Sequence, residues 1–238
     1  MKFHIVTLFE ESCTSYIESS IIARAIKDKK ISVSFYNPRD FVTGKYKKVW
    51  PDGNVSRIAD DRPFGGGPGM VLRAEPILKA VEKIKSKIKN PKAKIKTILF
   101  SPSGELFTTD YAKKVVKQKY TDIILLCGRY EGIDARVQKI LKAELLSVGD
   151  YVLTGGELPA LVVLDCLSRQ IPGVLGNFNS LEEERVSSPD AYTRPEELVW
   201  KGKTYKVPPV LLSGNHKDIE AWKKSTREGK KDLPKKSV

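Results

Sequence analysis

The chain has 238 residues and a formal net charge of +13, from 42 Lys and Arg against 29 Asp and Glu. A chain of this length buries roughly 70–75% of its unfolded surface, which is enough for one large domain or for one domain with a small appendage. No run of 18 apolar residues occurs, so no membrane-spanning helix is expected, and the positive charge favours nucleic acid over an acidic membrane surface as a partner.

The cysteines and the N-terminal segment indicate a cytoplasmic protein. Cys13, Cys127 and Cys166 are odd in number and widely spaced, so we expect no disulfide framework. The chain begins directly with a strand-like segment at residues 3–8, without the basic, apolar and small-residue succession of a signal peptide. A reducing, cytoplasmic setting follows from both observations.

Strand and helix patterns alternate along residues 1–175. Residues 31–36 alternate apolar and polar side chains like a half-buried strand, and residues 97–100 and 123–127 are continuous apolar runs, as in strands covered on both faces.

Helical spacing occurs at residues 17–25, 77–84 and 133–141, and Thr108 or Thr109 is expected to cap a further helix. A fifth unit combines the apolar run 145–148 with a helix after Pro159. This alternation predicts an α/β domain whose mostly parallel sheet carries helices on both faces.

Three stretches depart from the alternation. Residues 37–73 are far longer than a usual connection, and such loops are commonly functional or disordered. Residues 176–195 are polar and acidic and are interpreted as an interdomain linker. Residues 196–238 form a short basic region with two tryptophans, too small for a large core of its own.

The stretch 147–159 carries the strongest functional signal. A short apolar run ends in Gly149 and Asp150, Gly155 and Gly156 follow, and Pro159 lies in the first turn of an apolar helix. A core helix preceded by a loop does not need these three glycines together. Backbone that closely approaches a small ligand does.

Residues 127–134 repeat this arrangement of strand, glycines and helix. Gly128 ends a buried strand and Gly132 precedes the next helix, and ligands of open α/β sheets bind at such carboxyl ends. The alternative interpretation is a tight turn that leaves Arg129 and Glu131 as a surface ion pair.

A third motif, residues 60–70, has glycines at positions 65, 67 and 69. It follows charged residues rather than an apolar strand, so a dinucleotide fingerprint is rejected. We interpret it as a shaped lid or substrate platform, with a flexible loop as the alternative.

The sequence contains no motif for a zinc site, a serine nucleophile or a phosphate-binding loop. His4 and His216 are far apart in sequence, and no Cys-x-x-Cys or His-x-x-x-His occurs, so no structural zinc site is expected. Neither a Gly-x-Ser-x-Gly elbow nor a Walker A motif is present.

The chain resembles bacterial tRNA (guanine-N1)-methyltransferases, the TrmD family, in the order of its motifs. The resemblance extends from residue 1 to about residue 224 and rests on six spaced motifs, at residues 60–70, 128–134, 149–159, 172–176, 192–195 and 212–216.

The resemblance implies an α/β SPOUT domain with a C-terminal trefoil knot, then a linker and a small helical C-terminal domain. It implies methyl transfer from S-adenosylmethionine to N1 of guanosine 37 of tRNA, next to the anticodon, by a homodimer whose active site lies between the subunits. It also implies dependence on Mg²⁺, without indicating the ligands of the metal.

The family's binding positions map onto this chain residue by residue. Those that match substrate-binding motifs are Asp60, Arg194, Asn215 and His216. Those that match cofactor contacts are Pro102, Gly128, Tyr130, Glu131, Gly132, Val148, Gly149, Asp150, Tyr151, Val152, Leu153, Gly155, Gly156 and Pro159.

Two residues match the family's catalytic positions. N1 of guanine carries a proton that a general base must remove, and its loss places negative charge on O6, which an arginine can stabilise. The matching arginine is Arg169, and the base position, an aspartate in the family, is Glu184 here, with Glu182, Glu183 and Asp190 as alternatives. Competing hypotheses are a non-catalytic RNA-binding protein and an α/β enzyme that acts on a small nucleotide.

Overall fold

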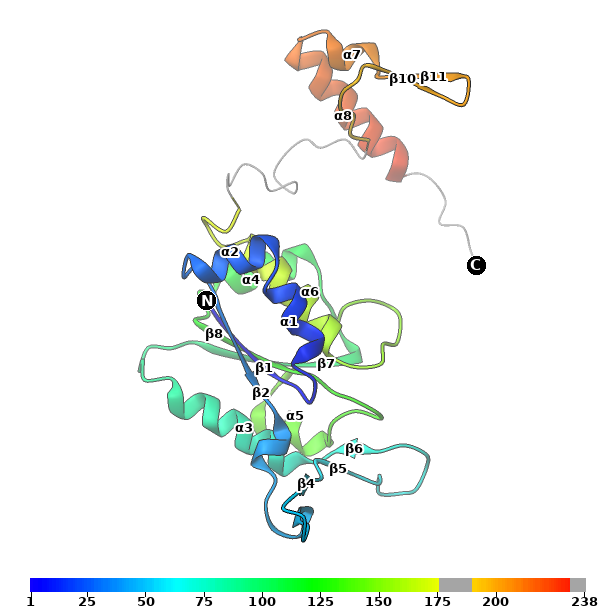
Figure 1. The fold of residues 1–238 in the computed structure, drawn as a ribbon. Helices are drawn as coiled ribbons and strands as arrows, with labels where there is room; N and C mark the ends of the chain where they lie inside the picture. Colours follow the sequence, from blue (N-terminus) through cyan, green and yellow to red (C-terminus); the bar gives the residue numbers. More distant parts are fainter. Residues whose placement is uncertain (176–189, 232–238) are drawn as a thin grey trace. The chain divides into compact units, whose positions relative to one another are not determined.

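Five parallel strands form the centre of the larger of two units in the computed structural model, which describes residues 1–175 and 190–231 (Figure 1). The sheet order is β2-β1-β8-β7-β9, and every pairing in it is parallel. The strands are β1 (Lys2–Val6), β2 (Ser32–Tyr36), β7 (Ile95–Leu106), β8 (Asp122–Leu126) and β9 (Glu144–Ser147).

Helices cover both faces of this sheet, as Figure 1 shows. On one face lie α1 (Glu11–Ile17), α2 (Ser20–Lys27), α4 (Thr109–Lys117) and α6 (Glu157–Arg169). On the other lie α3 (Ala74–Lys87) and α5 (Ala135–Leu141). The predicted α/β fold with a mostly parallel sheet is confirmed.

The central strand β8 shows why continuous apolar runs form the middle of such a sheet. Its side chains alternate between the two faces, so Ile123 and Leu125 join one core and Ile124 and Leu126 join the other. All four are fully buried, so both faces of this strand must be apolar.

One predicted helix start is confirmed and one predicted helix is divided. The Thr108 side chain caps α4 by accepting a hydrogen bond from the Tyr111 amide at 3.1 Å, as predicted. The helical spacing at residues 17–25 does not form one helix, because α1 ends at Ile17 and α2 begins at Ser20.

Strand β7 is longer than the apolar run that predicted it. It continues past Phe100 to Leu106, and its register shifts so that Phe100 and Glu105 both lie opposite Leu146 of β9. A Cβ atom at Gly104 would lie 2.4 Å from the Leu146 amide nitrogen, so only glycine permits this backbone contact.

The long segment 37–73 is ordered into small elements rather than one loop. It holds two 3-10 helices, η1 (Pro38–Phe41) and η2 (Gly44–Tyr46), and two hairpins, β3 (Lys47–Val49) with β4 (Val55–Arg57) and β5 (Asp60–Asp61) with β6 (Val71–Leu72). Residues 62–70, with the glycines, form the connection between β5 and β6.

The second unit, Gly176–Val238, is described from residue 190. It contains the antiparallel hairpin β10 (Glu197–Trp200) and β11 (Lys203–Lys206), then α7 (Pro209–Leu212) and α8 (His216–Lys231). The Tyr192 ring packs against Trp222 with a centroid distance of 6.3 Å. Among the described residues of both units, no helix has the length and apolar character needed to cross a membrane.

Candidate active site

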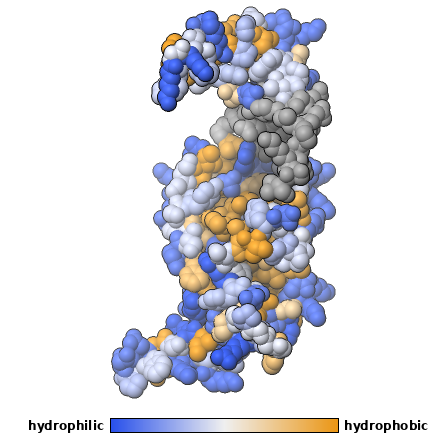
Figure 2. All heavy atoms as spheres, turned by 90° about the vertical axis from the view of Figure 1, so that its right-hand side faces the viewer, coloured by the Kyte–Doolittle hydropathy of each residue, from blue (hydrophilic) through white to orange (hydrophobic). Residues whose placement is uncertain are grey.

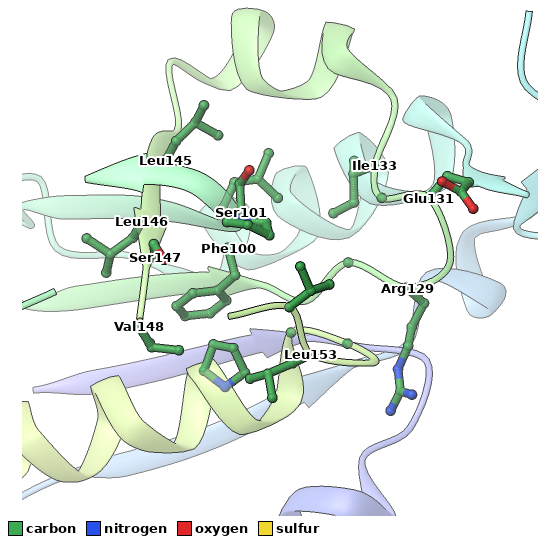
Figure 3. Close-up of a pocket in the computed structure, with 18 of the residues that line it drawn as sticks. Phe100, Ser101, Arg129, Glu131, Ile133, Leu145, Leu146, Ser147, Val148 and Leu153 are labelled. Carbon is green, nitrogen blue, oxygen red and sulfur yellow. The ribbon is translucent and has the colours of Figure 1, made fainter. Parts of the chain in front are cut away.

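A cavity of about 500 Å³ opens at the carboxyl ends of β8 and β9 and beside the middle of β7. The loop at residues 148–156 and the start of α6 close its other side. Figure 3 shows Phe100, Val148 and Leu153 at this cavity, whereas the side chains of Arg129 and Glu131 point away from it. Its volume lies within the range of sites for ligands of cofactor size.

Most positions that the resemblance assigns to a cofactor come together in this cavity. All of them except Gly149 and Asp150 contribute to its lining: Pro102, Gly128, Tyr130, Glu131, Gly132, Val148, Tyr151, Val152, Leu153, Gly155, Gly156 and Pro159. Gly149 lies beneath the Tyr151 ring, and a Cβ atom there would lie 2.2 Å from the nearest ring carbon. Gly149 therefore permits the position of Tyr151, while Asp150 is exposed beside it.

Several cavity residues were not predicted. They include Phe100, Ser101, Ile133, Leu145 and Leu146. Phe100, Leu145 and Leu146 belong to apolar runs that also predict strands, so their pattern alone does not distinguish a core residue from a cavity residue. The signal that could have identified them as cavity residues was their position near the ends of those runs.

The loop after β8 turns sharply where it borders the cavity. Tyr130 has a φ of 58° and Gly132 a φ of 112°, so both residues adopt left-handed backbone conformations. The Glu131 amide donates to Met70 O at 3.0 Å, and the Leu72 amide donates to Gly132 O at 3.0 Å. The ends of the glycine-rich segment at residues 60–70 are thereby attached to a wall of the cavity.

Gly156 brings the start of α6 against the end of β8. Its amide donates to Gly128 O at 2.9 Å, and a Cβ atom at Gly156 would lie 2.6 Å from the Cys127 Cα and 2.9 Å from the Gly128 amide nitrogen. Both obstacles are backbone atoms, which have little freedom to move aside. The φ of Gly156 is −83°, so only this contact, and not backbone conformation, requires glycine.

Gly156→Ala is expected to lower the free energy of unfolding by about 1–3 kcal/mol, as overpacking of a core does. Gly128→Ala is the matched control, because its Cβ atom would meet nothing closer than Ile133 Cγ1, at 3.6 Å. Thermal denaturation of both variants tests this. Equal melting temperatures for the two would show that the backbone at Gly156 yields easily.

A buried carboxylate ties three segments together beside the cavity. Glu157, the first residue of α6, is 3% exposed and accepts a hydrogen bond from Thr7 Oγ1 at 2.6 Å. Its other oxygen lies 2.9 Å from Arg129 Nε, and the Arg129 guanidinium also covers the Phe9 ring at 4.6 Å. The alternative interpretation of Arg129 and Glu131 as a surface pair is therefore wrong, since Arg129 binds a carboxylate 28 residues away.

The two buried thiols near this carboxylate are not nucleophiles at neutral pH. Burial, and then the negative charge of Glu157, raises the pKa of Cys13 to about 11. The same two causes raise the pKa of Cys127 well above its usual value. Since the thiolate is the reactive form, both cysteines act here as small buried side chains.

The predicted catalytic residues are only partly described. Arg169 is the last residue of α6 and is half-buried. Asp165, one turn earlier, accepts a hydrogen bond from Tyr16 Oη of α1 at 2.6 Å. Glu182, Glu183 and Glu184 lie outside the described residues, and Asp190 is the first described residue after them.

The four predicted substrate residues are distributed over both units. Asp60 lies in β5 of the larger unit, opposite Leu72. Arg194, Asn215 and His216 lie in the second unit, and all three are exposed. Asn215 also caps α8, because its side-chain oxygen accepts from the Lys217 amide at 3.1 Å.

No group of three or more His, Cys, Asp or Glu side chains could hold a metal ion within residues 1–175 and 190–231. His4 is buried, with Nε2 2.9 Å from Asp122 Oδ1, and so is a packed residue of β1. The described residues thus provide no ligand set for the Mg²⁺ that the resemblance implies.

Comparison with known proteins completes these observations. The relatives named tRNA (guanine-N(1)-)-methyltransferase include one from Clostridioides difficile. It is 44% identical over an alignment of 248 positions, which covers 100% of this chain and 99% of the relative. Others are from Ruminiclostridium cellulolyticum, 43% identical with 98% and 96% covered, and Campylobacter jejuni, 41% identical with 94% and 90% covered. The family model of tRNA (Guanine-1)-methyltransferase TrmD matches residues 1–236, and the chain belongs to this family.

Proposed function

We propose that this protein transfers the methyl group of S-adenosylmethionine to N1 of guanosine 37 in tRNA. The main support is the cavity at the ends of β8 and β9 and the middle of β7, which gathers nearly all the predicted cofactor positions in a chain of this family. The net charge of +13 suits an RNA substrate.

The cavity has the chemistry that this cofactor needs. Phe100, Leu145 and Leu153 provide an apolar surface for a purine ring, and the glycines at 128, 132 and 155 leave backbone at the cavity uncovered by side chains. When bound, S-adenosylmethionine supplies an electrophilic methyl group on a sulfonium. Glu157 contributes indirectly, because it fixes Arg129 next to Gly128 and so holds the loop after β8.

Two side chains would act on the guanine. We assign to Glu184 the removal of the N1 proton and to Arg169 the stabilisation of the charge that then develops on O6. Arg169 suits this role because the end of a packed helix restricts where its guanidinium can go. Glu182, Glu183 and Asp190 remain alternatives for the base.

We also propose that the chain around the cavity forms a trefoil knot. Support comes from the close backbone contacts at Gly104 with β9 and at Gly156 with the end of β8, where no side chain fits between the segments. Gly155 forms an antiparallel bridge with Arg129 in the same region. Close packing of these segments is one condition for a knotted chain.

We propose that a second copy of the chain completes the active site. Apolar side chains lie exposed on the loop before α6 and on the outer face of that helix, including Tyr151, Val152, Leu158 and Val162. Figure 2 shows apolar residues gathered on this side of the larger unit. A contiguous apolar surface of this kind is typical of a protein interface, and we propose that the homodimer closes the site there.

The proposed tRNA contacts involve both units. Asp60 lies next to the cavity wall through its pairing with Leu72, where it can accept hydrogen bonds from a guanine. Arg194, Asn215 and His216 are exposed donors in the second unit.

Methyl transfer from labelled S-adenosylmethionine to two tRNA transcripts tests the function. We expect about one methyl group per tRNA with guanosine at position 37, recovered as 1-methylguanosine after digestion, and none with adenosine there. Binding of the G37 transcript without transfer would favour the non-catalytic RNA-binding hypothesis. Transfer to free GMP at a comparable rate would favour an enzyme for small nucleotides.

A further inference from the structure

The hairpin β3–β4 carries a group of cations and an exposed tryptophan that the cavity does not use. Lys45, Lys47, Lys48 and Arg57 lie on or beside its strands, and Trp50 stands at the end of β3. Asp52, in the turn, is the one acidic residue between positions 45 and 57, and it accepts hydrogen bonds from Asn54.

Both faces of this hairpin are open to solvent. Its register places Val49 opposite Val55 on one face, and Lys48 opposite Ser56 on the other. Val49 is 68% exposed and Trp50 is 52% exposed. A two-stranded hairpin without a covering layer is marginally stable in water, so such exposed apolar groups suggest a binding surface.

The base of the hairpin is nevertheless well anchored. The Ile58 amide donates to Tyr46 O at 3.0 Å, and the Arg73 guanidinium lies 3.4 Å from the centre of the Tyr46 ring. Arg73 Nη1 also donates to Ile58 O at 3.1 Å. The fixed base and the open tip are the arrangement of an element that presents side chains to a partner.

The anchor connects the hairpin to the cavity. Immediately after β4 the chain enters β5, which pairs with β6, and the Leu72 amide of β6 donates to Gly132 O in the cavity wall. In Figure 1 the hairpin lies beyond α3, at the end of the larger unit. A substrate much longer than one nucleotide could therefore occupy the cavity and reach the hairpin.

We propose that hairpin β3–β4 is a second contact for the RNA substrate, in which Lys47 and Lys48 bind phosphates and Trp50 stacks on an unpaired base. Lys47 and Lys48 form no ion pair within the residues that the structure describes, so their charges are available for phosphates. Aromatic side chains among cations are the usual combination for single-stranded RNA. A second copy of this chain, at +13, is a less suitable occupant.

This inference rests on the proposed function, and its test measures tRNA binding and methyl transfer separately. Trp50→Ala is expected to raise the Kd and the KM for tRNA about tenfold, since one stacked base contributes on the order of 1–3 kcal/mol. Trp50→Phe should retain most of the affinity, because phenylalanine can still stack. The kcat and the Kd for S-adenosylmethionine should stay unchanged in both variants.

Lys47→Gln with Lys48→Gln tests the phosphate contacts. The slope of log Kd against log salt should become shallower by roughly 1.4–1.8 for two lost contacts. Lys89→Gln with Lys92→Gln, two exposed lysines between α3 and β7, is the control with the same loss of charge and should change the slope little.

Unchanged tRNA affinity and salt slope in the hairpin variants would overturn the proposal. The proposal would also be overturned if the hairpin variants changed the molecular mass of the protein measured by sedimentation but not its tRNA binding. That result would assign the hairpin to contacts between copies of the chain. If the wild type binds tRNA but transfers no methyl group, the proposed function fails while the binding data still decide the role of the hairpin.

Discussion

Glu157→Ala is expected to lower the free energy of unfolding of the larger unit by about 3 kcal/mol. Removing one member of a buried ion pair costs about 3–5 kcal/mol, because the partner's charge stays behind without compensation. The lower end applies here because 22% of the Arg129 side chain is exposed to solvent. The variant also leaves Thr7 Oγ1 without its acceptor. The melting temperature should fall by roughly 6–12 °C.

Two further variants make this result specific to the buried site. Glu157→Gln keeps the shape and an acceptor for Thr7, so it should cost less than Glu157→Ala. Glu75→Ala removes an exposed carboxylate that pairs with Lys79 at 2.8 Å, and surface pairs of this kind contribute little. Similar melting temperatures for Glu157→Ala and Glu75→Ala would contradict a structural role of the buried pair.

The same variant connects stability to the cofactor. Arg129 directly follows Gly128 and forms a bridge with Gly155, so both glycine-bearing walls of the cavity depend on its position. Titration calorimetry with S-adenosylmethionine should therefore show weaker binding for Glu157→Ala even at temperatures where the protein remains folded.

The sequence predicted those parts of the fold that depend on local periodicity. The buried run at residues 123–127 became β8, and Thr108 became a helix cap, because each signal comes from neighbouring residues. The end of β7 was not predictable in this way. Pro102, Ser103 and Gly104 are turn residues by composition, yet they form the irregularity between Phe100 and Glu105, and β7 pairs with β9 on both sides of it.

Contacts between residues far apart in the sequence could not be predicted from the periodicity of apolar residues. Glu157 lies in the first turn of α6, where a carboxylate complements the helix dipole. Its partners, Thr7 and Arg129, are 150 and 28 residues away, and only the folded sheet brings them together. Among the cavity positions, the glycines at 128, 132, 155 and 156 followed from the physical reading of the two glycine motifs, and the other positions came from the resemblance to a known family.

The hairpin β3–β4 was missed although the sequence contains a signal for it. Pro51, Asp52 and Gly53 separate two short runs of apolar and polar residues, which is a hairpin pattern. Gly53 adopts a φ of 82° and its amide donates to Trp50 O at 2.9 Å, as the turn requires. This short pattern lies inside a segment, residues 37–73, that as a whole predicts one long connection.

Glu184→Gln is expected to lower kcat about 10²–10⁴-fold, the usual contribution of a general base. The amide has nearly the shape of the carboxylate but cannot take the N1 proton, so the Kd values for tRNA and S-adenosylmethionine should change little. Arg169→Ala should likewise keep cofactor binding and lose most turnover, because charge on O6 develops only in the transition state. Single-turnover methyl transfer with both ligands saturating measures these losses.

The double variant and the neighbouring acids decide whether these two residues act on the same step. If both groups act in one proton transfer, Glu184→Gln combined with Arg169→Ala should lose little more than the worse single variant. Glu184→Asp should retain much more activity than Glu184→Gln, since it keeps a carboxylate at the position where the family has aspartate. Glu182→Gln, Glu183→Gln and Asp190→Asn are the controls, and a loss of 10²-fold or more in one of them with near-normal Glu184→Gln would reassign the base to that residue, because a single carboxylate must carry the proton.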